Sequence, residues 1–312
     1  MCTLCYLDED GENSFTTIPA DTPYWADHTV AAVEPTVTHS PPGPSHTLVT
    51  VGLASDDPSE VEAIRQCLAA HSDCFREELL PQDFIKDIPP LEFPTLPERV
   101  CRAQYPLKER HMVFIDTCLE KYLRSNTAEV VTDPEEIQRT HISPIVVAET
   151  GGKQRLCLDP TRVNFLSKQF CQSVALQDPP PMLDLLHRAV ADAGPTGRFL
   201  QADLCSGFNL LRLAPSLARL FGFRHRGRIC RFTRLPFGWV LSPGVFVAAV
   251  AQLLGLDWYV DDQIRGFRTV QVLLDHLCSV LATCAAHGFK LKGSKCRLWL
   301  PQLAALGYRI SM

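Results

Sequence analysis

The chain has 312 residues, of which 46% are hydrophobic and 21% charged, so it is long enough to bury a core and too apolar to be disordered or fibrous. Its longest apolar run, from Val245 to Leu256, is shorter than the roughly 20 residues of a membrane-spanning helix, and the N-terminus lacks a secretion signal. We therefore expect an intracellular, cytoplasmic protein with no membrane partner, the nucleus being the alternative location.

The net charge of −5 combines two halves of opposite sign. Residues 1–150 hold 10 Lys and Arg against 26 Asp and Glu, whereas residues 151–312 hold 20 against 9, which gives −16 and +11. Seven arginines follow one another closely in the second half: Arg212, Arg219, Arg224, Arg226, Arg228, Arg231 and Arg234. Such a cluster indicates either a phosphate-binding surface or a solvated arginine face, and the two interpretations are about equally supported by the cluster alone.

The 13 cysteines lie scattered through apolar stretches of a chain with no export signal, which predicts free thiols in a reducing compartment. Cys2 and Cys5 have the spacing of metal ligands, but no second pair follows closely. A zinc site is therefore not favoured.

The first part of the chain predicts a leader followed by two helices. Residues 1–55 are rich in Pro, Thr, Ser and Asp, which is typical of a loosely structured segment. Apolar residues at helical spacing predict a helix from Ser59, as its N-cap, to His71, and a second, amphipathic helix over 110–124.

From Ser143 the pattern changes to short β-rich runs between turns. Strands 144–147 and 155–158 are joined by a hairpin loop at 149–153, and a helix begins at Pro179–Pro181. The further expected elements are a strand at 199–204, an arginine-rich hairpin, a helix from Ser242 to about Leu254, a strand at 257–260, a helix at 270–287 and a closing hairpin at 297–310.

Acidic residues follow two apolar strands that lie far apart in the sequence: Asp203 ends one, and Asp261-Asp262 ends the other. Nucleotidyl transfer uses two divalent ions about 3.5–4 Å apart, and carboxylates are ligands that suit Mg²⁺. Adjacent strand residues point to opposite faces, so both members of the pair can serve only if the chain turns, and a hairpin at Asp262-Gln263 would allow this. An isolated Asp-Asp pair is more commonly only a turn.

Five motifs, in order, resemble the successive sequence blocks of reverse transcriptases from LTR and DIRS-like retroelements. They are Asp203-Leu-Cys-Ser-Gly-Phe208, Leu235-Pro-Phe-Gly-Trp239 with Ser242-Pro243, Tyr259-Val-Asp-Asp262, Gly288-Phe-Lys-Leu291 with Lys295-Cys296, and Leu306-Gly-Tyr308. Upstream, Arg155-Leu-Cys-Leu-Asp159 resembles the fingers block of the family. The resemblance covers roughly residues 59–312.

The resemblance implies an α+β fold, namely the fingers and palm of a right-hand polymerase, with an antiparallel palm sheet backed by helices and a thumb that is absent or truncated. It divides the chain into the leader, a lead-in at 56–142, and fingers and palm at 143–312, with fingers at about 143–168 and 211–240 and palm at about 169–210 and 241–312. The implied function is RNA-directed DNA polymerase activity on a primed RNA or DNA template. The implied cofactors are two Mg²⁺ ions, with Mn²⁺ as a substitute, and the implied partners are deoxynucleoside triphosphates and other domains of a retroelement polyprotein.

The resemblance also implies a role for each motif residue. The metal ligands would be Asp203, Asp261, Asp262 and the Leu204 carbonyl, with Lys295 as the acid that protonates pyrophosphate. The nucleotide site would comprise Arg155, Ser206, Gly207, Phe208, Phe237 and Gly238, with the Phe208 ring excluding ribonucleotides. Leu306, Gly307 and Tyr308 would position the primer end.

The chain departs from the family pattern in three ways. Ala148 and Glu149 stand where the fingers usually carry lysines, and Lys153 is the nearest cation. Only fifteen residues separate Pro243 from Tyr259, so the helix between these motifs is short. A short helix could shift the strand that carries Asp261 relative to Asp203. No segment resembles a thumb, ribonuclease H, protease or integrase. The alternatives are an inactive or truncated relic that still binds nucleic acid and, with less support, a metal-dependent nuclease, which gives Phe208 no role.

Overall fold

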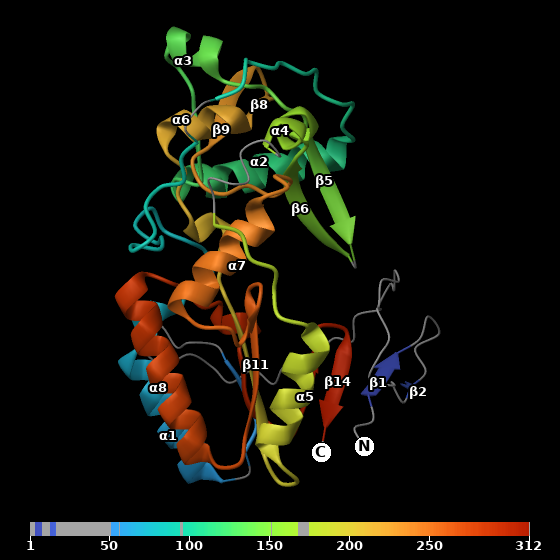
Figure 1. Ribbon diagram of the computed structural model, residues 1–312, viewed down its shortest axis with the longest axis vertical. Helices are drawn as coiled ribbons and strands as arrows, with labels where there is room; N and C mark the ends of the chain where they lie inside the picture. Colours follow the sequence, from blue (N-terminus) through green and yellow to red (C-terminus); the bar gives the residue numbers. More distant parts are fainter. Residues whose placement is uncertain are drawn as a thin grey trace.

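The computed structural model describes residues 4–7, 13–16, 51–55, 57–93, 96–150, 152–167 and 175–311. The ribbon forms two lobes, one above the other in Figure 1, and helix α7 (Ser242–Leu253) lies between them. Both lobes combine helices with mainly antiparallel sheets, so the chain has the expected α+β fold.

The upper lobe surrounds a three-stranded sheet and a separate hairpin. The sheet has the order β4-β9-β8, with β4 (Ala128–Val130), β9 (Arg228–Phe232) and β8 (Gly222–His225), and the hairpin pairs β5 (Ile145–Thr150) with β6 (Lys153–Leu158). The helices of this lobe are α2 (Glu109–Arg124), α3 (Pro134–Arg139), α4 (Thr161–Ser167) and α6 (Pro215–Ala218). Strand β4, from the acidic half of the chain, thus pairs with the arginine-rich β9.

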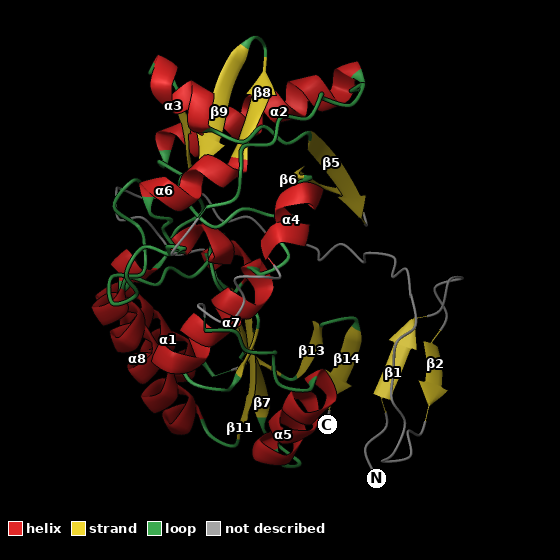
Figure 2. Ribbon diagram, turned by 45° about the horizontal axis from the view of Figure 1, so that its top comes forward, coloured by secondary structure: helices red, strands yellow, loops and turns green. Residues whose placement is uncertain are grey.

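The lower lobe contains a five-stranded sheet in the order β10-β11-β7-β12-β3. Its strands are β10 (Trp258–Tyr259), β11 (Asp262–Phe267), β7 (Arg198–Asp203), β12 (Arg297–Leu300) and β3 (Gly52–Leu53), and only the β12–β3 pair is parallel. The helices are α1 (Pro58–Ala70), α5 (Met182–Ala193) and α8 (Val270–His287). Figure 2 shows α5 and α8 on opposite sides of β7 and β11.

The two faces of this sheet are buried in separate cores because strand side chains alternate. Leu200 and Ala202 of β7 belong to the large core that includes α8, whereas Phe199 and Ile264 belong to a smaller core beneath α5. A Cβ at Gly266 would lie 1.8 Å from the Ala189 carbonyl oxygen, so β11 needs glycine for α5 to approach this closely. The acidic strand ends are therefore held by a sheet packed on both sides.

Most helices and strands expected from the sequence are present, with small corrections at their ends. Helix α1 is capped by Asp57, whose Oδ1 accepts from the Ser59 amide at 2.8 Å, and not by Ser59. Pro58 takes the first helical position, where its missing amide donor is not needed. Helix α5 begins at Met182, after the prolines that were expected to start it. The closing hairpin is three strands: β12, β13 (Gln302–Ala305) and β14 (Tyr308–Ser311).

The segment expected as a loose leader contains strands where the structure describes it. Strands β1 (Leu4–Leu7) and β2 (Asn13–Thr16) extend a second sheet in the order β13-β14-β1-β2, and β3 joins the main sheet. The rest of the leader and the side chains of Cys2 and Cys5 lie outside the described residues. The expected lead-in, 56–142, contributes α1 to the lower lobe and α2 to the upper lobe.

Helix α8 is long and apolar enough in composition to cross a membrane, a candidate that the sequence analysis missed. Four of its residues, Leu273, Leu277, Leu281 and Cys284, are buried in the large core. Because these residues recur every three or four positions, they form one face packed against the rest of the molecule, as in the core helix of a folded domain.

Candidate active site

The two acidic motifs lie side by side at one end of the main sheet. Strands β7 and β11 are antiparallel, and Asp262 is the register partner of Asp203. The Leu204 amide donates to the Asp261 carbonyl at 2.8 Å and continues the pairing beyond the strands. The short helix α7 therefore does not displace the Asp261 strand, contrary to our expectation, because β7 itself holds β11 in register.

The turn that carries the acidic pair lies two residues earlier than the predicted turn at Asp262-Gln263. Tyr259 pairs with Asp262, so Val260 and Asp261 form a two-residue hairpin turn, and Asp262 already belongs to β11. Val260 has φ of +58°, which is rare for a β-branched residue. Asp261 is thus placed by a turn, whereas Asp262 shares a sheet face with its partner Asp203.

Asp203 is nearly fully buried, and its two oxygens differ. Oδ2 accepts from Lys295 Nζ at 2.6 Å, whereas Oδ1 has no hydrogen-bond partner within the described part of the chain. An unpartnered buried carboxylate oxygen costs free energy, and such groups commonly mark a functional site. Lys295, which the motif assigns to the site, is thus in direct contact with Asp203.

Burial raises the pKa values of all three carboxylates. For Asp262 it raises the pKa to about 6, opposed by a hydrogen bond from Gln201 at 3.1 Å and assisted by repulsion from Asp261 and Asp203. For Asp203 it outweighs the opposing effect of Lys295. Burial alone would lower the pKa of Lys295, but its hydrogen bond and attraction to Asp203 raise it. The three carboxylates thus interact as one coupled group, whose negative charge Lys295 only partly offsets.

The donor set fits divalent cations in part. Asp203 offers a free buried oxygen, Asp261 stands at the adjacent turn, and the repulsion among the carboxylates is of the kind that a bound cation relieves. No three His, Cys, Asp or Glu side chains among the described residues are already arranged around a common point. Asp203 and Asp261 are therefore the best-placed ligands, and Asp262 is held instead by Gln201.

The expected nucleotide residues surround the acidic pair. A Cβ on Gly207 would lie 2.7 Å from Phe246 Cζ and 3.4 Å from Asp261 Cβ, so only glycine fits beside the turn. The half-buried Phe208 ring packs against Phe237 at 5.1 Å and Phe246 at 5.4 Å between centroids. The structure therefore brings Phe208 and Phe237, from two different motifs, into contact.

The Leu235-Pro-Phe-Gly loop packs closely against β6 and is hydrogen-bonded to it. Gly238 has φ of +104°, and a Cβ there would lie 1.9 Å from the Leu158 carbonyl oxygen. The Leu158 amide donates to the Phe237 carbonyl at 3.0 Å. On the same strand Arg155 is exposed, and its charge contributes to lowering the pKa of Asp261 against the larger effect of burial. Arg155 is thus one of the cations whose charge acts on Asp261.

Glu149, which replaces a family lysine, makes structural contacts. It accepts from Gln154 at 2.7 Å within the hairpin and from Arg110 of α2 at 2.9 Å, and His111 Nε2 lies 3.2 Å away. Its carboxylate ties the β5–β6 hairpin to α2. Lys153, at the hairpin tip, forms no ion pair with any residue that the structure describes.

The expected primer-positioning residues form another two-residue hairpin turn. Ala305 pairs with Tyr308, and the linking residues Leu306 and Gly307 have φ of +52° and +82°. Two positive φ values are typical of a type I′ turn, which suits Gly307 better than Leu306. The turn joins β13 and β14 at the edge of the smaller core.

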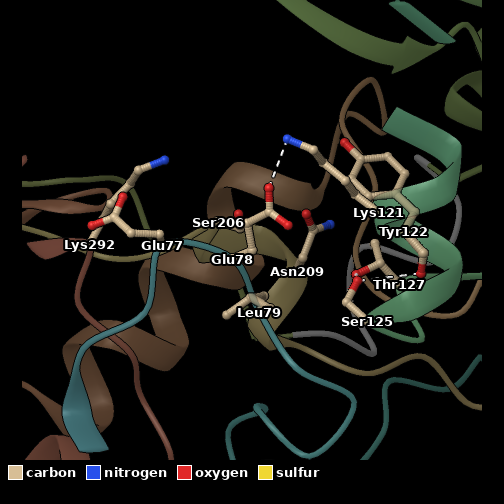
Figure 3. A pocket seen from close by; sticks show the side chains of 10 residues that line it. All are labelled: Glu77, Glu78, Leu79, Lys121, Tyr122, Ser125, Thr127, Ser206, Asn209 and Lys292. Atoms are coloured by element: carbon tan, nitrogen blue, oxygen red, sulfur yellow. Dashed lines mark hydrogen bonds and ion pairs between the residues drawn. The ribbon is translucent and has the colours of Figure 1, made fainter. Parts of the chain in front are cut away.

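A cavity of about 180 Å³ lies beside the acidic site and contains lysines that the sequence analysis did not select. Its lining includes Ser206 of the first motif and Asn209, which follows that motif, with Lys292 on one side and Lys121 on the other (Figure 3). Lys121 is paired with Glu78 at 2.8 Å, whereas Lys292 forms no ion pair within the described residues. Lys292 lies between the motif Gly288–Leu291 and Lys295, a signal that could have identified it.

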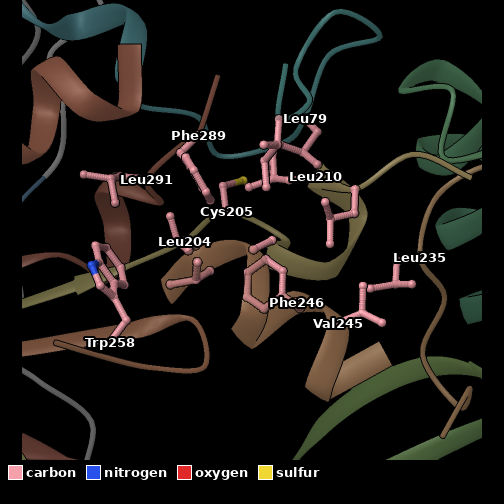
Figure 4. Packing of buried hydrophobic residues seen from close by; sticks show 14 of the residues in the cluster. Leu79, Leu204, Cys205, Leu210, Leu235, Val245, Phe246, Trp258, Phe289 and Leu291 are labelled. Atoms are coloured by element: carbon pink, nitrogen blue, oxygen red, sulfur yellow. The ribbon is translucent and has the colours of Figure 1, made fainter. Parts of the chain in front are cut away.

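The motifs are held together by one shared core. Figure 4 shows Leu204 and Cys205 of the first motif, and Leu210 just after it, packed with Phe246 of α7 and Leu291 of the fourth motif. The Cys205 amide donates to the Lys290 carbonyl at 2.7 Å, and the Lys292 amide donates to the Asp203 carbonyl at 2.8 Å. Motifs that are far apart in sequence are thus joined by backbone hydrogen bonds around a common apolar centre.

Most of the arginine cluster makes contacts within the fold, whereas Arg224, Arg226 and Arg228 are exposed on the β8–β9 hairpin. Its paired members contact acidic or carbonyl groups: Arg219 and Arg231 bind Glu136, Arg226 binds Asp116, Arg231 also binds Glu129, and Arg234 is buried among backbone carbonyls. Arg212 lies over the Phe84 ring at 3.9 Å. Only Arg224 and Arg228 are exposed without an ion pair to a described residue. The cluster is mainly structural because acidic residues of the first half reach it.

Comparison with known proteins agrees with the geometry. Residues 152–310, just over half of the chain, match the family model described as reverse transcriptase (RNA-dependent DNA polymerase). The chain belongs to the reverse transcriptase family. It is 28% identical over 163 residues to the retrovirus-related Pol polyprotein from transposon 412 of Drosophila melanogaster, covering 50% of this chain and 12% of the relative. It is 26% identical over 219 residues to the Pro-Pol polyprotein of simian foamy virus type 3 (strain LK3), covering 67% and 18%.

Solved reverse transcriptases share the fold. A foamy viral protease-reverse transcriptase in complex with an RNA/DNA hybrid superposes with a TM-score of 0.68 at 21% identity, covering 85% of this chain and 34% of that one. The same type of enzyme in complex with dsDNA gives a TM-score of 0.69 at 23% identity, covering 85% and 53%. The chain spans 12% of the transposon polyprotein and 18% of the foamy virus polyprotein, less than a fifth of the length of either relative.

Proposed function

We propose that this reverse transcriptase chain is an RNA-directed DNA polymerase that extends a primer by two-metal nucleotidyl transfer. The observation that carries the proposal is the pairing of Asp203 with Asp262 on adjacent strands, next to the Val260-Asp261 turn, together with the unpartnered buried Oδ1 of Asp203. We assign the upper lobe to the fingers and the lower lobe to the palm, and the template, primer and deoxynucleoside triphosphates to the space that both lobes border.

Asp203 and Asp261 would hold the divalent cations, Mg²⁺ or Mn²⁺, with the Leu204 carbonyl and Asp262 as further oxygen ligands. Bound cations would lower the charge on the triphosphate and activate the primer 3′-hydroxyl. The chain itself orients these ligands, because β7, β11 and the backbone contacts to residues 290–292 fix the acidic turn. Lys295 would be the proton donor to pyrophosphate, and its hydrogen bond and attraction to Asp203 raise its pKa and so favour the protonated form that this role requires.

The triphosphate would lie against the backbone amides of Ser206 and Gly207, since a small residue and a glycine let phosphate oxygens approach. Arg155 would contact it from the fingers, where a planar guanidinium suits phosphate. The family lysines are missing from β5, and we assign part of their role to Lys292, which stands in the cavity beside Ser206. Glu149 cannot contribute, because its charge is negative and it is bound to α2.

Primer extension by the complete chain on an RNA template tests this proposal. With Mg²⁺ and deoxynucleoside triphosphates, we expect a primer to be lengthened into DNA. The alternative, an inactive relic that binds nucleic acid, predicts salt-sensitive template binding and no extension, because phosphate contacts weaken as counterions compete. Binding without extension in both Mg²⁺ and Mn²⁺ would favour the relic.

Phe208→Val is expected to relax sugar selection. The ring now fills space against Phe237 and Phe246 beside the nucleotide site, and a smaller side chain would leave room for a ribose 2′-hydroxyl. The ratio of kcat/KM for deoxyribonucleotide over ribonucleotide should fall at least about 10-fold, which corresponds to about 1.4 kcal/mol. Phe223→Val, a substitution in the same type of aromatic core but in the upper lobe, is the control. An unchanged ratio in Phe208→Val would contradict the assignment.

Asp262→Asn is expected to stabilise the metal-free protein above pH 6. Burial raises the folded-state pKa of Asp262 from 3.8 to about 6, so the folded state favours the protonated form and loses stability as pH rises from about 4 to about 6. Because Asp262 is partly exposed, solvent screening reduces this effect, and the expected loss in the free energy of unfolding is about 1–2 kcal/mol. Asparagine carries no charge and therefore avoids this loss. Thermal unfolding in chelator at pH 5 and pH 8 measures the effect. The variant should gain several degrees at pH 8 relative to the unsubstituted protein and less at pH 5; an equal gain at both would refute the assignment.

A further inference from the structure

A pair of cysteines outside the active site lies in direct contact. Cys67 of α1 and Cys278 of α8 have sulfur atoms 3.0 Å apart, about 1 Å more than the length of a disulfide bond. All ten cysteines that the structure describes are free thiols, as expected, and this is the contacting pair among them. Neither residue belongs to a reverse transcriptase motif, and 211 positions separate them.

The contact is produced by the packing of two helices. Ile64 and Leu68 of α1 are buried on either side of Cys67, and Leu277 of α8 is buried next to Cys278. These apolar residues seal the interface between the helices, and the two cysteines lie at its edge. The buried Ile64, Leu68 and Leu277 hold the two helices against each other, and this packing keeps the two sulfur atoms within 3.0 Å.

The two thiols differ in environment. Cys278 is exposed, whereas Cys67 is half-buried, and burial followed by the hydrogen bond with Cys278 raises the pKa of Cys67 to about 12. An oxidant from solution therefore reaches Cys278 first, and Cys67 stays protonated until a partner accepts its proton. By contrast, Cys74, Cys284 and Cys296 are buried and out of reach of solvent oxidants.

We propose that Cys67 and Cys278 are a redox modification site, at which a peroxide oxidant forms an intramolecular disulfide that crosslinks α1 to α8. The Cys278 sulfur attacks a peroxide oxygen; an S–O bond forms as the O–O bond breaks, which yields a sulfenic acid and one water. The Cys67 sulfur then attacks the Cys278 sulfur, an S–S bond forms, and the S–O bond breaks to release a second water that carries the Cys67 proton. Two thiols are oxidised by two electrons, and one hydrogen peroxide is reduced to two waters.

The crosslink would tie together segments that the chain otherwise joins only through packing. Helix α1 lies outside the region that matches the family model, whereas α8 lies within it. A bond between residues this far apart restricts the unfolded chain strongly, so oxidation should raise the midpoint of thermal unfolding by at least about 3 °C. A thiol reductant should reverse the change. This inference does not depend on polymerase activity.

Peptide mapping of the complete chain without reduction tests the proposal. After treatment with hydrogen peroxide, we expect one peptide pair that joins Cys67 to Cys278 with the loss of two hydrogens, and its disappearance with dithiothreitol. Cys67→Ser and Cys278→Ser should each abolish the crosslink and the thermal shift. Cys101→Ser, a change of an exposed cysteine elsewhere, should leave both intact.

Three outcomes would overturn the proposal. They are oxidation of Cys278 to sulfinic or sulfonic acid with no crosslink, a dimer linked through Cys278 that persists in Cys67→Ser, and a disulfide between other cysteines. The mapping of the unsubstituted protein decides among these even if a serine variant fails to fold.

Discussion

Primer extension is expected to fall at least about 1,000-fold in Asp203→Ala and in Asp261→Ala, because each substitution removes a carboxylate from the proposed metal site. A metal ion contributes several kcal/mol to stabilising the charge that develops on phosphate, and each 1.4 kcal/mol is a factor of ten in rate. The measurement is single-turnover extension of a primed RNA template in Mg²⁺ and in Mn²⁺.

Folding and chemistry can be separated with two further variants. Asp203→Asn keeps the shape of the side chain and removes a charge that burial disfavours, so its fold should be retained while extension is lost. Asp275→Ala, at an exposed aspartate on α8 that binds only Gln271 of its own helix, should leave extension unchanged. Extension that persists in Asp203→Ala would refute the site, whatever the fold.

Arg234→Met should produce the largest loss of stability, about 3–5 kcal/mol or on the order of 10 °C in the unfolding midpoint. The Arg234 guanidinium is buried and donates to the carbonyls of Asn209 at 3.0 Å, Pro81 at 2.9 Å and Asn126 at 3.2 Å, and also to that of Asp83. Burial lowers its pKa to about 10, so it stays charged at neutral pH. Methionine would fill the space but remove the guanidinium donor from the Asn209, Pro81 and Asp83 carbonyls, whereas the Asn126 carbonyl would still accept from Thr233 at 2.6 Å.

Two further variants test whether the carbonyl contacts of Arg234 cause the loss of stability. Arg234→Lys keeps the charge but cannot donate in several directions from a planar fork, so it should recover only part of the lost stability. Arg228→Met changes an exposed arginine of β9 and should cost less than about 0.5 kcal/mol. Equal midpoints for Arg234→Met and Arg228→Met in thermal unfolding would show that the carbonyl contacts do not stabilise the fold.

The sequence by itself determined the secondary structure around the site and the order of its motifs. The apolar run Phe199-Leu-Gln-Ala before Asp203 predicted β7, and the sequence also predicted α8 with the bounds that it has, Val270–His287. These predictions succeed because backbone hydrogen bonding and side-chain periodicity act over a few residues. The blocks from Asp203 to Tyr308 also identified the family, since each block has a recognisable local pattern.

Only the tertiary structure decided which distant groups neutralise or contact one another. The arginines around Arg231 could be a binding surface in the sequence, yet Glu129 and Glu136, about a hundred residues away, pair with Arg231. Likewise, the contact of Lys295 with Asp203 and that of Cys67 with Cys278 have no local pattern. Ion pairs and thiol contacts form only between side chains that the fold brings within a few ångströms of each other. Composition and spacing along the chain do not determine these distances between side chains.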